Sequence, residues 1–243
     1  MTSSDLQLVK LSEIASFKYG KTIRKSEVHE SEGYPVHSGY QVVGYLPNYM
    51  YQEPQLLIVC RGAGGTGDVK ISPAKCSITN LAIVISCDLS KVDMGYLYWR
   101  LLLSDTYSLR TGSAQPQITI NTLDSFEILI EPSILKQKEI AKHLFLLNEK
   151  IETNNQINQT LEQMAQAIFK SWFVDFEPVK AKIAALEAGG SEDDALLAAM
   201  QVISGKDPQQ LTQLQTENPE HYTSLRATAE LFPATMQESE LGE

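Results

Sequence analysis

Residues 137–172 read QKEIAKHLFLLNEKIETNNQINQTLEQMAQAIFKSW, a stretch without proline or glycine. Apolar or small side chains recur in it in alternating steps of four and three residues, which is the period of a coiled-coil seam. As one α-helix the stretch would extend about 54 Å. We therefore predict a long helix, whose seam positions are Ile140, Leu144, Leu147, Ile151, Asn154, Asn158, Leu161, Ala165, Ile168 and Trp172.

A helix with a single apolar seam is not stable alone in water, so the pattern predicts a second helix packed along it. Asn154 and Asn158 fall in the middle of the seam. Buried asparagines cost stability but fix the register and the geometry of the partner helix. The alternative is that the helix packs along its own globular domain, for which it is unusually long.

The sequence before this helix has the pattern of an α/β domain with short strands and few helices. Residues 7–19, with Ser12 as the expected N-cap, and Met94–Ser108 each predict a helix. Runs rich in apolar and β-branched residues predict buried strands. These runs are Leu56–Cys60, Ala82–Ser86 and Phe126–Ile130.

The formal net charge of −10 is unevenly distributed along the chain. Residues 1–136 carry 12 Lys and Arg against 13 Asp and Glu, whereas residues 181–243 carry 3 against 11. A nearly neutral N-terminal part predicts weak non-specific affinity for DNA, because phosphate neutralisation by basic side chains dominates that affinity. We expect three parts: an α/β domain over residues 1–135, the long helix over 136–180, and an acidic helical appendage over 181–243.

Several classes of protein are not indicated by the sequence. Cys60, Cys76 and Cys87 are odd in number and form no C-x-x-C pair, so neither a disulfide framework nor a zinc site is expected. The four histidines have no metal-ligand spacing. No apolar stretch approaches the roughly 18 residues of a membrane span, and the N-terminus has no signal pattern. We expect a cytoplasmic protein with buried free thiols, no metal and no membrane contact.

Two glycine motifs suggest nucleotide binding but lack the required context. Gly62–Gly67 matches G-x-G-x-x-G after a predicted strand, and Asp88 lies near the position of a ribose-binding acid. The motif must open a helix, yet the β-branched, proline-containing stretch Asp68–Pro73 follows it. Gly20–Thr22 resembles the end of a phosphate loop, but the earlier glycine is replaced by Ala15. We expect the first motif to be a loop between strands.

A series of stretches resembles, in order and spacing over residues 7–180, the specificity subunit of type I restriction-modification enzymes. The region between the two recognition domains of such subunits is similar to Met164–Phe176 here. The other similar stretches are Val9–Ala15 followed by Gly20–Thr22, Tyr34–Gly39 with Gly44 and Tyr45, Leu57–Gly62 with Gly67, Gly112 to Ile118, and Pro132 with Gln137, Ile140 and Ala141.

The resemblance implies a fold and a function. Such subunits carry two target-recognition domains in tandem, each reading one half of a split DNA site. Each domain is followed by a long helix, and the two helices pair antiparallel as a spacer. Methyltransferase subunits dock on this frame and modify adenine with S-adenosylmethionine, and a motor-nuclease subunit adds cleavage driven by ATP and Mg²⁺. The specificity subunit has no catalysis of its own and binds none of these cofactors.

This chain departs from that pattern because it has one recognition domain and one spacer helix. Its last residues, 232–243, resemble the segment just before a second recognition domain, so we expect a half-length form, natural or truncated. Another copy of the same helix is then the expected partner for the seam. An antiparallel homodimer would be two-fold symmetric and would read a palindromic split site.

Sequence reading in the major groove uses Arg or Lys for guanine and Asn or Gln for adenine. Such residues, with polar neighbours, cluster in four predicted loops of the N-terminal domain. The candidate DNA-binding residues are Tyr19, Lys21, Arg24, Ser38, Tyr40, Gln41, Arg61, Thr66, Lys70, Arg110, Gln115 and Gln117.

Two other functions stay open at this point. One is a coiled-coil assembly or regulatory protein that has lost DNA reading. The other is a small-molecule enzyme that uses the Gly62–Gly67 loop. The aromatic residues Trp172, Phe173 and Phe176 are expected to be a packing anchor at the end of the long helix rather than a platform for base stacking.

Overall fold

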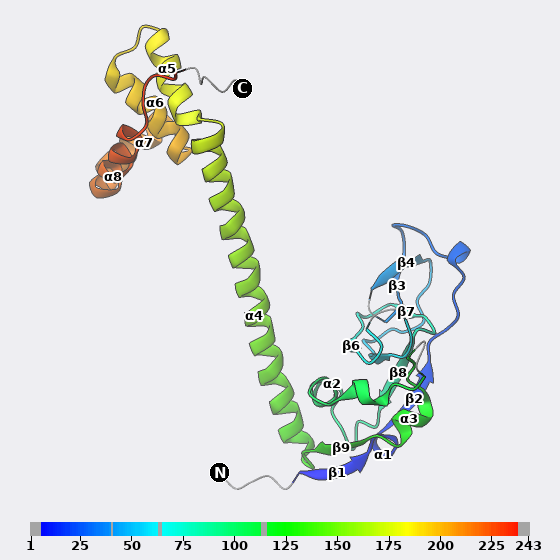
Figure 1. The fold of residues 1–243 in the computed structure, drawn as a ribbon. Coiled ribbons are helices and arrows are strands. Elements are labelled where there is room, and N and C mark those ends of the chain that lie inside the picture. The colour runs from blue at the N-terminus through cyan, green and yellow to red at the C-terminus, as the bar shows by residue number, and fades with distance from the viewer. Residues whose placement is uncertain (1–5, 40, 63–64, 113–115, 238–243) are drawn as a thin grey trace. The chain divides into compact units, whose positions relative to one another are not determined.

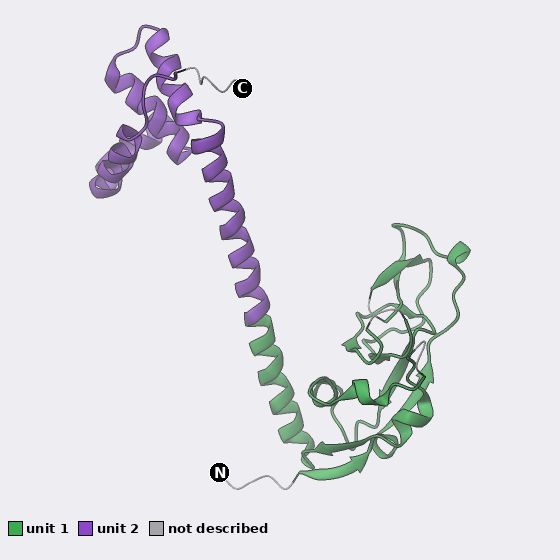
Figure 2. Cartoon of the chain, viewed as in Figure 1, with its two compact units in different colours: residues 1–150 green, residues 151–243 purple. Residues whose placement is uncertain are grey.

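The computed structural model describes residues 6–39, 41–62, 65–112 and 116–237. The chain divides into two compact units, residues 1–150 and residues 151–243 (Figure 2). Helix α4, Ile134–Phe169, which Figure 1 labels, begins in the first unit and continues into the second, as its change of colour in Figure 2 shows. This division does not test the three parts expected from the sequence, whose bounds stay predictions.

The first unit is built on short, mostly antiparallel strands (Figure 1). A four-stranded sheet has the order β2-β8-β5-β6, a second sheet has the order β4-β3-β7, and β1 pairs with β9. The pairing of β3 with β7 is parallel and the others are antiparallel. The strands are β1 (Gln7–Lys10), β2 (Ala15–Tyr19), β3 (Tyr34–His37), β4 (Val42–Leu46), β5 (Leu56–Val59), β6 (Val69–Ile71), β7 (Ser77–Ile78), β8 (Ala82–Cys87) and β9 (Glu127–Ile130). The helical segments before α4 are α1 (Leu11–Ile14), α2 (Met94–Leu102), α3 (Ile120–Asp124), and the 3₁₀ turns Lys25–Glu27 and Thr106–Leu109.

Strands β5 and β8 are buried on both faces of the four-stranded sheet. Leu56 and Ile58 point into the main core, where Leu97 of α2 also lies. Leu57 and Val84 point to the opposite face, into a smaller apolar cluster. A strand covered on both sides needs apolar residues at successive positions, which explains the uninterrupted apolar runs in the sequence. The three strands predicted from those runs are confirmed.

The helix predicted over residues 7–19 is wrong. Only Leu11–Ile14 is helical, because β1 pairs with β9 on one side of it and β2 pairs with β8 on the other. Exposed Leu8 and buried Val9 alternate as strand residues do. The Ser12 hydroxyl donates to the Asp124 carbonyl oxygen at 2.8 Å and does not cap a helix. The helix predicted over Met94–Ser108 is present but ends at Leu102.

Helix α4 packs onto the first unit through one face of its first turns. Gln137 and Ala141 are buried, four residues apart. Ala141 and Phe145 lie against Gly95 of α2, where an added Cβ atom would be 2.8 Å from the Phe145 ring. The Phe145 ring also stacks on Tyr98 with centroids 5.9 Å apart. This face differs from the predicted seam, so the docking of the helix leaves most of the seam exposed.

Most of the predicted seam is exposed. The exposed fractions are 59% for Leu147, 58% for Ile151 and 56% for Leu161. Ile140 and Ile168 are also exposed, as are Asn154, Asn158 and Ala165, whereas Leu144 and Trp172 are half-buried. Side chains of this size and hydrophobicity in regular steps along one helix indicate an unfilled helix-packing surface.

The second unit contains the end of α4 and four helices with their own core. A π-helical turn, Lys170–Val174, ends α4. The core is formed by Leu196, Ala199, Met200, Leu211, Leu225 and Ala229. The helices are α5 (Glu177–Glu187), α6 (Glu192–Ser204), α7 (Pro208–Glu217) and α8 (Pro219–Glu230). This part of the chain is thus helical, as expected for residues 181–243.

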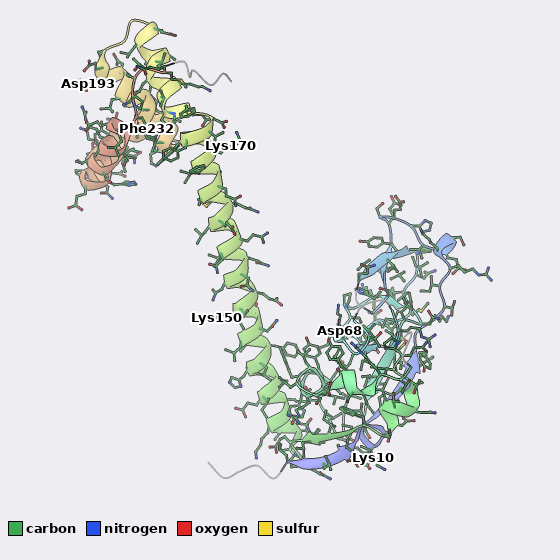
Figure 3. The ribbon with its side chains drawn as sticks, viewed as in Figure 1. Lys10, Asp68, Lys150, Lys170, Asp193 and Phe232 are labelled. Atoms are coloured by element: carbon green, nitrogen blue, oxygen red, sulfur yellow. The ribbon has the colours of Figure 1, made fainter. Side chains whose placement is uncertain are left out.

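The segment after α8 returns to the end of α4 within the second unit (Figure 3). The Phe232 ring lies edge-on to Trp172 with centroids 5.5 Å apart. The buried Lys182 ammonium donates to the Phe232 carbonyl oxygen at 2.6 Å. Trp172 and Phe173 therefore belong to an aromatic packing cluster, as the sequence suggested for them.

Among the described residues, no helix combines the length and the apolar character that crossing a membrane requires.

Candidate nucleic-acid interface

The loops that contain most of the candidate residues lie along one edge of the four-stranded sheet, the edge at which its strands begin or end. Tyr19 at the end of β2 pairs with Ile83, and Val59 at the end of β5 pairs with Ala82. Ile58 pairs with Val69 at the start of β6. Because neighbouring strands are antiparallel, the end of one strand lies beside the start of the next. The loops after β2, between β5 and β6, and before β8 therefore meet at this edge.

Backbone hydrogen bonds join these loops to one another and to residues 110–118. We call residues 19–25, 60–62, 65–70, 79–81, 110–112 and 116–118 together the loop edge. The Ile118 amide donates to the Cys60 carbonyl at 2.9 Å, which brings the last segment to the sheet. The other bonds are Gly20 to Ala82 at 3.0 Å, Lys21 to Ile78 at 2.9 Å, Asn80 to Lys21 at 3.0 Å and Cys60 to Leu81 at 2.9 Å, with the amide named first.

Charge in the first unit is concentrated at the loop edge. Six of the 12 Lys and Arg of residues 1–136 lie in its segments, against one of the 13 Asp and Glu, Asp68. The six are Lys21, Arg24, Lys25, Arg61, Lys70 and Arg110. The nearly neutral total therefore hides a strongly basic edge. Such a local concentration of cations attracts polyanions even where the net charge does not.

Arg61 leaves the end of β5 with its guanidinium over an aromatic ring. Its Cζ lies 5.6 Å from the centroid of Tyr19, within the range of a cation–π contact. Its Nε is buried without a hydrogen-bond partner among the described residues. Two predicted DNA-binding residues are thus in contact, and one of them carries an unpaired donor.

Arg110 is held by a second ring and by a backbone carbonyl. Its Nε donates to the Thr66 carbonyl oxygen at 2.7 Å, and its Cζ lies 4.2 Å from the Tyr107 centroid. The Tyr107 hydroxyl donates to Asp68 Oδ1 at 2.8 Å. This bond to the carboxylate raises the pKa of Tyr107 above its usual value of 10.0. Figure 3 labels Asp68 in the first unit.

His37 and Lys70 lie near each other beside the loop edge. The Thr79 amide donates to the His37 carbonyl at 2.9 Å. Burial, with a smaller contribution from the positive charge of Lys70, lowers the pKa of His37 below 6.5. The imidazole is therefore neutral at pH 7, with its Nε2 buried and unpaired within the described chain.

The remaining candidate residues differ in accessibility. Lys21, Arg24 and Gln41 are exposed, and Gln117 is half-buried with its amide and carbonyl paired to Thr111. Ser38 and Thr66 are buried, and their hydroxyls donate within their own loops, to Gln41 at 3.1 Å and to Gly62 at 3.4 Å. Tyr40 and Gln115 lie outside the described residues. No observation tests which of the twelve residues contact DNA, so these assignments stay predictions.

Two residues of the loop edge, Asp68 and Asn80, and Tyr107 beside it were not identified as site residues from the sequence. Asp68 was considered only as the start of the stretch that breaks a dinucleotide motif, and Tyr107 only as part of a predicted helix. Asn80, whose Nδ2 donates to Thr22 Oγ1 at 3.2 Å, was not considered. No sequence signal marks these residues, because their roles depend on contacts 39 or 58 positions along the chain.

The loop Gly62–Gly67 connects antiparallel strands β5 and β6, as expected, and does not open a helix. Residues 63 and 64 lie outside the described part. No group of three or more His, Cys, Asp or Glu side chains suited to a metal ion occurs among the described residues. A groove of about 390 Å³ adjoins the loop edge, lined by Ile23, Lys25, Val28, Val36, Ser38, Val43, Thr79, Asn80 and Leu81.

The chain matches a known protein family over most of its first unit and beyond. The family described as type I restriction modification DNA specificity domain matches residues 3–163. The chain is 52% identical over 123 residues to the type I restriction enzyme HindI specificity subunit of Haemophilus influenzae, a match covering 51% of this chain and 27% of that protein. It is 38% identical over 90 residues to the MjaIX specificity subunit of Methanocaldococcus jannaschii, covering 35% and 20%. The chain therefore spans well under two thirds of these relatives.

Solved structures share the fold. The crystal structure of a type I restriction-modification S subunit from M. genitalium superposes with a TM-score of 0.59 at 18% identity, covering 77% of this chain and 51% of that one. A structure described as the basis of complex assembly and conformational transition of the type I R-M system gives 0.52 at 16% identity, covering 70% and 46%. The family match, which spans more than half of the chain, agrees with the motifs over residues 7–180. The chain belongs to the type I restriction-modification DNA specificity family.

Proposed function

We propose that this chain recognises a DNA sequence through the loop edge and contributes no catalysis of its own. It would read one half of a bipartite target in a type I restriction-modification system. Family membership supports a role in DNA specificity. The observation that carries the assignment to this edge is the segregation of charge, with six cations and one acid in its segments. Arg61 and Arg110 add oriented guanidinium groups suited to base edges.

The proposal is tested by selecting bound duplexes from a randomised pool with the full chain, in the presence of its methyltransferase subunit. We expect an enriched sequence. The double variant Lys21→Ala with Arg61→Ala should lose that enrichment or bind all duplexes more weakly. For every phosphate that the variant no longer neutralises, the slope of log affinity against log salt should fall by about 0.9.

A matched control is the double variant Lys10→Ala with Lys138→Ala. Both lysines are exposed and lie outside the loop edge, and Figure 3 shows Lys10 well away from Asp68. The control removes the same charge and should keep both the selected sequence and the salt slope. Equal losses in the two double variants would refute the assignment to the loop edge. A wild-type chain that enriches no sequence would instead favour the alternative, an assembly protein without DNA reading.

We further propose that the seam of α4 pairs with the same helix of a second copy, in an antiparallel homodimer. The exposed Leu147, Ile151 and Leu161 support this because apolar side chains at coiled-coil spacing are stabilised by burial against a like helix. Two recognition domains related by a two-fold axis would read a palindromic split site. The frame would hold the methyltransferase subunits and the motor-nuclease subunit in the cytoplasm, with S-adenosylmethionine, ATP and Mg²⁺ bound by those partners.

Light scattering tests the homodimer at micromolar concentration. The wild-type chain is expected to have twice the mass of one chain, and the double variant Ile151→Asp with Leu161→Asp is expected to be monomeric. The control places the same charges off the seam, with Gln156→Asp and Gln163→Asp at exposed positions. A monomeric wild-type chain, or a control that dissociates as readily as the seam variant, would contradict the homodimer.

A further inference from the structure

The segment Thr106–Arg110, whose first four residues form a 3₁₀ turn, is bonded to the glycine loop by three side chains. The buried Thr106 hydroxyl donates to the Gly67 carbonyl at 2.7 Å. The Tyr107 hydroxyl donates to Asp68 Oδ1 at 2.8 Å, and Arg110 Nε donates to the Thr66 carbonyl at 2.7 Å. Three consecutive residues, Thr66 to Asp68, are thus each bonded to this segment.

These hydrogen bonds are accompanied by close contact between the Tyr107 ring and the loop backbone. Gly67 has a φ of +101°, and a Cβ atom added there would lie 2.9 Å from Tyr107 Cδ1. Both facts require glycine at this position. The ring therefore lies close to the loop backbone and also beneath the Arg110 guanidinium, whose Cζ is 4.2 Å from the ring centroid.

This arrangement leaves one end of the Arg110 guanidinium available. Its Nε is occupied by Thr66, and one face of the plane is covered by Tyr107. Its two Nη groups have no hydrogen-bond partner among the described residues, and the side chain is exposed. Two parallel N–H donors at the end of a fixed plane match the O6 and N7 acceptors of guanine in the major groove.

We infer that Arg110 is a guanine-reading residue and that Tyr107 and Asp68 are the residues that position it. This inference rests on the proposed function. A phosphate contact needs charge but little orientation, and a flexible lysine supplies it. Orientation matters for reading a base, because the wrong base must be rejected. A guanidinium held by a ring and a carbonyl, with the ring itself held by a carboxylate, loses less freedom on binding than a mobile one.

The assignment is tested on the duplex selected by the full wild-type chain, by replacing its guanines one at a time with 7-deazaguanine, which lacks N7. At one position this should weaken wild-type binding about tenfold. The Arg110→Gln variant should bind more weakly but show no further loss with 7-deazaguanine at that position. Inosine, which keeps O6 and N7 and lacks only the minor-groove amino group, should leave wild-type binding unchanged there.

The Arg110→Lys variant separates base reading from phosphate binding. It keeps the charge and loses the planar fork, so the salt slope should be preserved. The guanine preference at that one position should be weakened but not abolished, because a lysine can contact guanine but lacks two donors held in one plane. If Arg110 binds phosphate instead, Arg110→Lys should keep the preference, and Arg110→Gln should weaken all duplexes alike and reduce the salt slope by about 1. That result would overturn the inference and leave the proposed function intact.

The positioning roles have their own readout. Tyr107→Phe, which removes the bond to Asp68, and Tyr107→Leu, which removes the ring, should reduce discrimination at the guanine read by Arg110 and at no other position, with Leu more severe. Asp68→Asn keeps an acceptor and should retain most of the discrimination. A uniform loss of affinity together with a lower melting temperature would show a merely structural role. A wild-type chain that selects no sequence would overturn the inference together with the proposed function.

Discussion

The side chain of His37, beside the loop edge, makes the stability of the first unit depend on pH. Its folded pKa is lowered below 6.5 by burial and by Lys70, so the fold favours the neutral imidazole. An unfolded chain binds the proton first as the pH falls. The contribution of His37 to stability is therefore complete above about pH 6.5 and decreases as the pH falls from there toward the lowered pKa.

We expect the free energy of unfolding of the first unit to be smaller at pH 5 than at pH 7.5, and His37→Gln to reduce this difference. Urea unfolding at both pH values, followed by hydrogen exchange in β5, measures it. His221→Gln, at an exposed position of α8, serves as the control and should leave the difference unchanged. An equal pH dependence in the wild type and in His37→Gln would contradict the assignment to His37.

At the scale of a whole element, the buried side-chain amide of Gln137 links the start of helix α4 to the rest of the first unit. The Gln137 side chain accepts a hydrogen bond from the Asp93 amide at 2.8 Å and donates to the Glu131 carbonyl at 2.6 Å and the Lys91 carbonyl at 3.3 Å. It therefore connects three segments at the start of α2 and α4. A buried polar group that loses its partner costs about 1–3 kcal/mol.

Gln137→Leu should consequently destabilise the first unit by about 2–3 kcal/mol, since it leaves buried backbone groups unpaired. The measurement is urea unfolding with exchange protection in α2 as the probe. Lys138→Ala changes the next, exposed residue and should have an effect below about 0.5 kcal/mol. A loss from Gln137→Leu no larger than this control would show that the amide bonds contribute little.

The other face of α4 carries Asn154 and Asn158 among exposed apolar residues. If the seam pairs with a second copy, a buried asparagine specifies register at a cost in stability. Asn154→Leu should raise the thermal stability of the homodimer and broaden its distribution of masses in light scattering. Gln156→Leu, at an exposed position outside the seam, should change neither the thermal stability nor the distribution of masses. An unchanged melting temperature in Asn154→Leu would place this asparagine outside the packed seam.

At the scale of the whole molecule, each unit has its own main apolar core among the described residues. Leu97 is fully buried in the first unit and Met200 is 1% exposed in the second. Truncating a buried Leu or Met to Ala costs roughly 2–5 kcal/mol. Leu97→Ala should therefore lower the urea concentration at which the amide hydrogens of β5 lose protection from exchange. Met200→Ala should lower the corresponding concentration for α6, and each variant should leave the other unit unchanged. A common shift in both units would show that they unfold as one.

How much the sequence predicts depends on how far apart the deciding contacts lie. The period of residues 137–172 and the apolar runs of β5 and β8 are local, and both predictions are confirmed. Residues 7–19 were predicted wrongly because the strands β9 and β8, distant in sequence, decide their structure. The four loops proposed for DNA contact were identified by composition, and the structure brings segments from three of them to one sheet edge. Which of their side chains are buried, and that Tyr107 and Asp68 hold Arg110, follows only from tertiary contacts.

The loop between β5 and β6 is fixed at both ends, by the Ile118 amide on Cys60 and by the Thr106 hydroxyl on Gly67. Between these two residues, none of the described side chains belongs to the apolar clusters of the first unit, and Thr66 is buried. Apart from Thr66 and the positive-φ glycines Gly62 and Gly65, substitutions between these two anchors should cost little folding free energy while altering what the surface presents. Mutation could then give lineages new target preferences on an unchanged scaffold, and selection would act on the loop interior while preserving its two anchors.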